Sequence, residues 1–85
     1  MGSAYSLVYS EQAADFLLSL KRSRLASLLY DLSCLALDPF VRSDYRLEDE
    51  QGRKIEHLLI GDFVVAYWVD HASSELRIID LSDVA

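Results

Sequence analysis

The sequence is poor in the residues that build disulfides and metal centres. Cys34 is the only cysteine among 85 residues, so no disulfide can form within the chain. One cysteine and two scattered histidines cannot supply a metal cluster, so we expect no metal, and we predict no cofactor. A chain without disulfides fits the reducing cytoplasm. Cys34 itself is expected to be a small, partly buried side chain, and Tyr30 to face solvent.

Cations and long apolar runs are scarce as well. Eight Lys and Arg stand against 14 Asp and Glu, which gives a formal net charge of −6. Phosphate backbones are held by clustered Lys and Arg, so this composition argues against direct binding of nucleic acid. No apolar run reaches the roughly 18 to 20 residues that span a bilayer, so no membrane partner is expected.

Apolar residues at helical spacing predict two helices before the only proline. Ser10 is placed to cap the first helix, and the cations of residues 21–24 are expected to close it. A second helix is expected to begin near Ser23 and to end before Pro39, which disfavours helical geometry at Asp38. The two helices should form a hairpin that covers one face of a sheet.

A central β-hairpin, residues 53–70, sets the register of the remaining strands. Gly61 and Asp62 form its two-residue turn, because glycine adopts the positive φ that the first central position needs. Neither face of this hairpin is polar along its middle, so both faces should be covered. The turn pairs Ile60 with Phe63, Leu58 with Val65 and Glu56 with Tyr67 on one face, and Leu59 with Val64, His57 with Ala66 and Ile55 with Trp68 on the other.

The fold class follows from the order of these elements. Residues 5–9, 44–48 and 75–80 alternate as strands, which gives the order β-α-α-β-β-β-β. We predict an α+β fold with a two-helix hairpin on one face of a mainly antiparallel sheet. Residues 5–85 should form a single domain, with residues 1–4 as start or vector residues ahead of it. The expected core is Phe16, Leu17, Leu28, Leu32, Phe63, Val65 and Tyr67.

Five segments share the order and spacing of a known family: YSLVYSEQAADFLLSL, LALDP, YRLED, LLIGDFVVAYWVD and ELRIIDL. Across the span from Tyr5 to Leu81 the sequence resembles the RelE/ParE toxins of bacterial type II toxin–antitoxin systems. Members of that family have a Ser before the first helix, an Asn-Pro or Asp-Pro after the second, and a Gly-Asp-Tyr-Arg hairpin. The resemblance implies the RelE/ParE fold and an antitoxin peptide or protein as partner. For some members it also implies ribosome-dependent cleavage of mRNA.

Position 64 departs from the ribonuclease members of the family. In those members an Arg of the Gly-Asp-Tyr-Arg segment helps to hold the phosphate, and the matching residue here is Val64. The remaining catalytic candidates are His57, as acid or base, and Arg53 and Arg77, as phosphate holders. The alternative role of His57 is that of a sheet residue packed beside Ala66. RNase activity is therefore not the expected function.

The sheet face away from the helices is expected to be apolar and to bind a partner. Trp68 should anchor that contact rather than stack bases, because no cationic groove accompanies it. Either a symmetric homodimer or an antitoxin could cover the face. Two functions stay open: a toxin that contacts an antitoxin and a cellular target, and an inactive RelE-fold protein that acts by dimerisation or binding. The predicted partner-binding residues are Ile55, Leu59, Val64, Ala66, Trp68 and Ile79, with Leu81 extending the surface.

Overall fold

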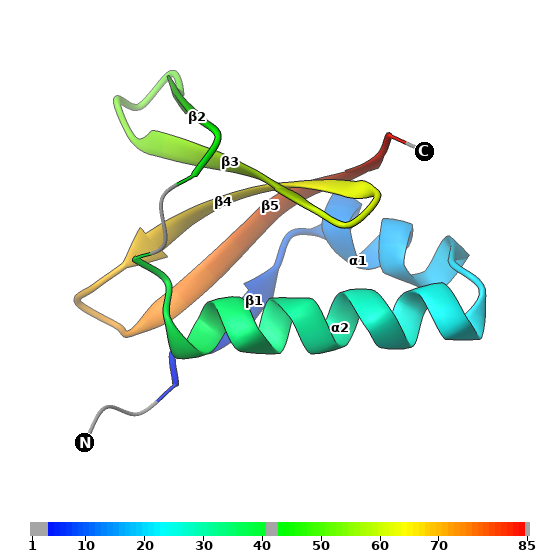
Figure 1. The fold of residues 1–85 in the computed structure, drawn as a ribbon. Coiled ribbons are helices and arrows are strands. Elements are labelled where there is room, and N and C mark those ends of the chain that lie inside the picture. The colour runs from blue at the N-terminus through cyan, green and yellow to red at the C-terminus, as the bar shows by residue number, and fades with distance from the viewer. Residues whose placement is uncertain (1–3, 41–42, 85) are drawn as a thin grey trace.

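A computed structural model describes residues 4–40 and 43–84 and shows the predicted α+β fold (Figure 1). The expectations for residues 1–3, 41–42 and 85 lie outside these described residues. The elements are β1 (Ser6–Tyr9), α1 (Glu11–Ser19), α2 (Arg22–Leu37), β2 (Tyr45–Glu48), β3 (Lys54–Ile60), β4 (Phe63–Asp70) and β5 (Glu75–Asp83).

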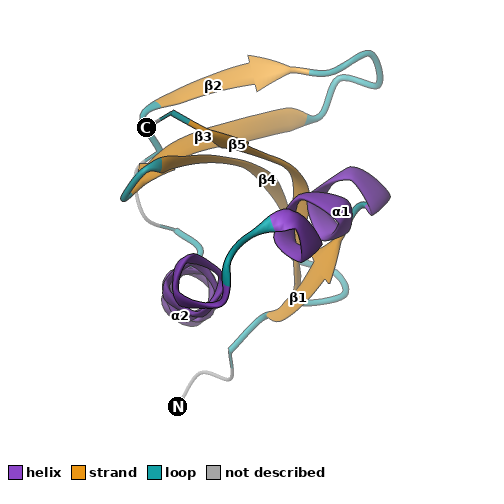
Figure 2. Ribbon diagram, turned by 90° about the vertical axis from the view of Figure 1, so that its right-hand side faces the viewer, coloured by secondary structure: helices purple, strands orange, loops and turns teal. Residues whose placement is uncertain are grey.

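The five strands form one sheet in the order β1-β5-β4-β3-β2. β2 to β5 pair antiparallel with their neighbours, whereas β1 pairs parallel with β5. Both helices lie on one side of the sheet and leave the other face open (Figure 2). The predicted two-helix cover of a mainly antiparallel sheet is therefore confirmed. Within the described ranges, no helix is long and apolar enough to cross a membrane.

Local sequence fixes where the helices begin and end. The Ala13 N–H donates a hydrogen bond of 3.0 Å to Ser10 Oγ, so Ser10 caps α1 as predicted. The same hydroxyl donates to the carbonyl oxygen of Ile79 on β5. α2 ends at Leu37, before Pro39, as the sequence predicts.

The prediction that the cations of residues 21–24 close α1 is wrong. α1 ends at Ser19 without a basic residue in its last turn. Lys21 is instead the N-cap of α2, and Arg22 and Arg24 lie in its first turn, where the helix dipole opposes a cation. Arg24 is stabilised by other groups: its guanidinium lies 2.8 Å from an Asp83 carboxylate oxygen and 4.7 Å from the centre of the Phe63 ring.

β3 and β4 form the predicted hairpin, and the observed register matches five of the predicted pairs. Gly61 has a φ of +59°, and among the described residues Ser74 is the one non-glycine residue with a positive φ. Asp62 therefore has a negative φ, which is the pattern of a type II′ turn. The confirmed pairs are Ile60 with Phe63, Leu59 with Val64, Leu58 with Val65, His57 with Ala66 and Glu56 with Tyr67.

A β-bulge in β5 changes which of its residues face the helices. Ala66 pairs with Asp80 but Tyr67 pairs with Ile78, so Ile79 is the extra residue. Beyond the bulge, Leu81 pairs with Val65 of the core and is only 4% exposed. The prediction that Leu81 extends the open face is therefore wrong.

The core lies between the sheet and the two helices. Phe16 is only partly buried, although its ring meets the Phe63 ring edge-on at a centroid distance of 5.9 Å. Cys34 is exposed on α2, so the prediction of partial burial is wrong, whereas Tyr30 faces solvent as predicted. The predicted core residues found buried are Leu17, Leu28, Leu32, Phe63, Val65 and Tyr67.

Candidate functional site

The candidate site is the open face, which we define as the sheet surface opposite the helices. Cross-strand neighbours share a face, so the observed ladders assign its members directly. Outside the ladders, Arg53 reaches this face from the residue before β3 by contacting Trp68. The ladders place Tyr45, Leu47, Ile55, His57, Leu59, Val64, Ala66, Trp68, Arg77, Asp80 and Ser82 on this face, whereas Ile79, the extra residue of the bulge, has no ladder partner.

Trp68 lies between two arginine side chains on this face. The guanidinium carbons of Arg53 and Arg77 lie 4.9 Å and 5.6 Å from the centre of the Trp68 ring, within the range of cation–π attraction. Each guanidinium is also held by a carboxylate. Arg53 Nε lies 2.7 Å from Asp49, and Arg77 Nη2 lies 2.6 Å from Glu75. Each guanidinium thus has a carboxylate partner through one nitrogen, while Arg77 Nε has no hydrogen-bond partner among the described residues.

A third carboxylate, that of Asp70, reinforces the arrangement around Arg77. Asp70 lies at the end of β4, 4.0 Å from Arg77 Nε. Hydrogen bonds from Ser73, together with the charge of Arg77, lower the pKa of Asp70 below its ordinary value. Asp70 therefore stays ionised at neutral pH and adds negative charge beside Arg77.

His57 lies apart from the two arginines, on the β2 side of the face. Its ring stacks on that of Tyr45 with a centroid distance of 4.5 Å and an interplanar angle of 8°. Its Nδ1 atom is buried and has no hydrogen-bond partner among the described residues. The structure therefore brings Arg53 and Arg77 together around Trp68 but does not bring His57 to them. This geometry fits a packed sheet histidine better than an acid or base flanked by phosphate holders.

The apolar residues of the open face differ in how far they reach solvent. Ile55 and Ala66 are only 8% and 7% exposed, so neighbouring side chains cover them. Val64, Trp68 and Ile79 are half-buried, and Leu59 is 53% exposed. Of the six residues predicted to bind a partner, Leu59 is thus the most exposed.

Two exposed residues of this face, Tyr45 and Leu47, were missed by sequence reasoning. They are 51% and 56% exposed. The signal was present, because Tyr45 and Leu47 alternate along β2 and pair with His57 and Ile55 of the open face. They extend the open face toward the edge strand of the sheet.

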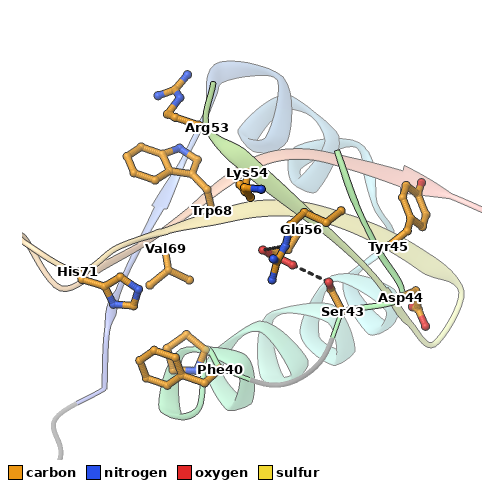
Figure 3. Close-up of a pocket in the computed structure, with 12 residues that line it drawn as sticks. Phe40, Ser43, Asp44, Tyr45, Arg53, Lys54, Glu56, Trp68, Val69 and His71 are labelled. Atoms are coloured by element: carbon orange, nitrogen blue, oxygen red, sulfur yellow. Dashed lines mark hydrogen bonds and ion pairs between the residues drawn. The ribbon is translucent and has the colours of Figure 1, made fainter. Parts of the chain in front are cut away.

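A polar hollow of about 680 Å³ lies beyond the end of α2, and Arg53, Trp68 and Tyr45 of the open face also line it (Figure 3). Phe40 and His71 bound it on one side, with their rings stacked at a centroid distance of 5.4 Å. Glu56 of β3 points into it and accepts a 2.6 Å hydrogen bond from Ser43 Oγ. Glu56 also lies 2.7 Å from Arg46 Nε. The charges of Glu56 and Arg46 therefore offset each other in the hollow.

The hydroxyl group of Tyr67 lies buried near this hollow. Tyr67 has no exposed surface, and its hydroxyl has no hydrogen-bond partner in the described part of the chain. Burial, helped by the negative charge of Glu56, raises the pKa of Tyr67 to about 12. Tyr67 therefore stays neutral at physiological pH.

Comparison of the sequence with protein-family models and with curated proteins finds no match. Comparison of the structure does find relatives. A chain of the archaeal RelE–RelB complex from Pyrococcus horikoshii has a TM-score of 0.75 at 21% identity, covering 98% of both chains. A RelBE toxin–antitoxin complex from Mycobacterium tuberculosis has a TM-score of 0.76 at 18% identity, covering 95% of this chain and 99% of the other.

The isolated RelE toxin of Escherichia coli is a third structural relative. It has a TM-score of 0.77 at 15% identity, covering 96% of this chain and 86% of the other. Identities this low establish the fold and leave the activity to be argued from the site. The protein has the fold of the RelE toxins, as the resemblance of its sequence implied.

Proposed function

We propose that this chain is the toxin component of a cytoplasmic toxin–antitoxin pair and that it acts through protein contacts. The RelE fold over nearly the whole chain supports the assignment, because two of the relatives are toxin–antitoxin complexes. On this proposal the open face receives the antitoxin. Its exposed residues Tyr45, Leu47 and Leu59 supply apolar contact area, and Trp68 supplies a rigid aromatic anchor.

The observation that carries the proposal is the state of the two arginines. Holding a phosphate requires guanidinium groups that are free to donate to it. Arg53 and Arg77 are engaged by Trp68 and by carboxylates, and position 64 of the same face bears a valine. Cleavage of mRNA at this face is therefore not part of the proposed function, and neither is direct binding of nucleic acid.

Copurification with an antitoxin tests the proposal. The tagged chain would be co-expressed with the small protein encoded beside its gene, and the yield of the complex measured by quantitative gel densitometry. Leu59→Glu, on the open face, should reduce the yield at least about tenfold by burying a charge in an apolar contact. Leu18→Glu is the matched control, because Leu18 is 82% exposed on α1 and lies on the other side of the sheet. Equal yields from the two variants would refute the open face as the antitoxin site.

The second candidate function is that of an inactive RelE-fold interaction protein, favoured by the same neutralised arginines. Induced expression in a bacterial host, followed by plating, separates the two functions. A toxin without RNase activity should produce a growth arrest that Arg53→Ala and Arg77→Ala leave intact and that the antitoxin relieves. Full growth without the antitoxin would favour the interaction protein. Loss of toxicity on replacing His57 or Arg77 would instead restore the catalytic hypothesis.

A further inference from the structure

α2 presents a second apolar surface, on the opposite side of the molecule from the open face. Seen end-on, α2 faces the sheet and α1 on one side, and no other helix or strand of the described residues lies against the rest of its circumference (Figure 2). The exposed residues recur at spacings of three and four along about three turns, as on a helix that packs against another helix. We call these residues the α2 stripe: Ala26, Leu29, Tyr30, Ser33, Cys34 and Leu37.

The α2 stripe contains no charged residue, which is unusual for a helix face in water. Tyr30 and Leu37 are each 70% exposed and Leu29 is 38% exposed. A helix that is apolar on both its inner and its outer side is normally covered on both. The other three members, Ala26, Ser33 and Cys34, are small and would let a partner backbone approach closely.

The order of large and small residues along the stripe is self-complementary. If a second α2 runs antiparallel with Ala26 opposite Leu37, then Tyr30 falls opposite Ser33 and Leu29 opposite Cys34. Every large side chain of one copy then meets a small one of the other, as interdigitated packing requires. A parallel arrangement would instead place each large residue against its own copy. The sizes along the stripe therefore favour antiparallel self-pairing.

The charges at the two ends of α2 favour the same arrangement. Lys21 and Arg22 lie at its N-terminal end, and Asp38 is its C-cap. Neither Lys21 nor Arg22 has an ion-pair partner within residues 4–40 and 43–84. An antiparallel second copy would bring its Asp38 close to these cations. The dipole of α2 is unfavourable to Arg22 within one chain, and the dipole of the second α2, which points the opposite way, would oppose it.

We propose that the α2 stripe is the interface of a symmetric homodimer, in which α2 pairs antiparallel with α2 of a second copy. The two-fold axis would cross the helices between Tyr30 and Ser33, so that each contact occurs twice. This interface leaves the open face free, so it is compatible with the proposed antitoxin contact and does not depend on it. An interface built on one helix of about four turns is small, and we expect a dissociation constant in the micromolar range.

Sedimentation velocity on the pure protein between about 1 and 100 μM tests for the dimer. The parent should shift from monomer to dimer across this range, and Leu37→Glu should stay monomeric. Leu18→Glu on α1 and Leu59→Glu on the open face are the controls, because these leucines are 82% and 53% exposed, on either side of the 70% of Leu37. Both should dimerise like the parent. A monomeric parent at 100 μM would overturn the proposal, as would a dimer that only Leu59→Glu dissociates.

A size swap tests the antiparallel register itself. Leu37→Ala leaves a gap opposite Ala26, and Ala26→Leu creates a clash with Leu37, so each should weaken the dimer about tenfold or more. Combining the two restores one large and one small residue at each contact, so the double variant should recover dimerisation to within a few-fold of the parent. Both positions are exposed, and circular dichroism would verify that the monomer stays folded. Additive weakening in the double variant would refute this register.

Discussion

Replacing Tyr67 with Phe is expected to stabilise the protein, although Tyr67 is fully buried in the core. The change keeps the aromatic ring, and with it the packing against the helices. It removes a hydroxyl group that is buried without a hydrogen-bond partner among the described residues. Burying such a group costs about 1 to 3 kcal/mol relative to leaving it in water. We therefore expect the free energy of unfolding to rise by about 1 kcal/mol, and the melting temperature by about 4 to 8 °C for a domain of this size.

The same substitution should change how stability depends on pH. The pKa of Tyr67 is raised to about 12, against about 10 in an unfolded chain. Between these values the unfolded chain loses the proton while the native protein keeps it, so the free energy of unfolding falls as the pH rises. A pKa difference of this size corresponds to about 2.7 kcal/mol, and at pH 11, midway between the two pKa values, about 1 to 2 kcal/mol of it should be lost.

Urea unfolding at pH 8 and at pH 11 would measure both effects. The advantage of Tyr67→Phe over the parent should be larger at the higher pH, because the variant lacks this alkaline loss. Tyr45→Phe is the control for removing a hydroxyl from an exposed tyrosine. It should leave the free energy of unfolding, and the change of that free energy between the two pH values, nearly as in the parent. A Tyr67→Phe variant less stable than the parent by 1 kcal/mol would show that the hydroxyl has a hydrogen-bond partner, and the reasoning would fail.

Three further predictions concern the fold. Leu32→Ala should lower the free energy of unfolding by about 2 to 5 kcal/mol, because Leu32 is fully buried. Leu29→Ala, on the exposed side of α2, should lower it far less, and thermal melts of the two variants would show the difference. Ser10→Ala should cost about 1 kcal/mol or more, because it removes the cap of α1 and the bond to β5, and Ser10→Asp should recover only the cap. Gly61→Ala should lower the free energy of unfolding by about 1 kcal/mol, because φ is +59° and alanine disfavours this conformation. A Cβ at this position meets nothing within 4 Å, so the whole effect should come from the backbone, and an unchanged urea midpoint would contradict the prediction.

The features that the sequence predicted well are those set by neighbouring residues. The Gly61–Asp62 turn fixed the hairpin register because a two-residue turn leaves one pairing for each following residue. Ser10 marked the start of α1 because its side chain bonds a backbone N–H three residues on. Both interactions are local, so a pattern within a few residues reveals them.

The features that the sequence did not predict depend on distant contacts. The bulge at Ile79 moved Leu81 into the core, and strict alternation along β5 gives no sign of an extra residue. The Ile79 carbonyl bonds to the Ser10 hydroxyl, 69 residues away. The candidate site shows the same limit: alternation placed Trp68 on the open face, but only the fold reveals that Arg53 and Arg77 lie against its ring.

The parallel pairing of β1 with β5 has a consequence for synthesis of the protein on the ribosome. Ser6 pairs with Glu75 and Tyr9 with Ile78, so β1 can pair in the sheet only after β5 has been synthesised. Until β5 leaves the exit tunnel, β1 has no neighbour in the sheet and α1 lacks its bond to Ile79. Pairings this distant in sequence form slowly, since a long loop must close first. The sheet therefore stays incomplete, with the apolar side chains of its strands exposed, until β5 has been synthesised.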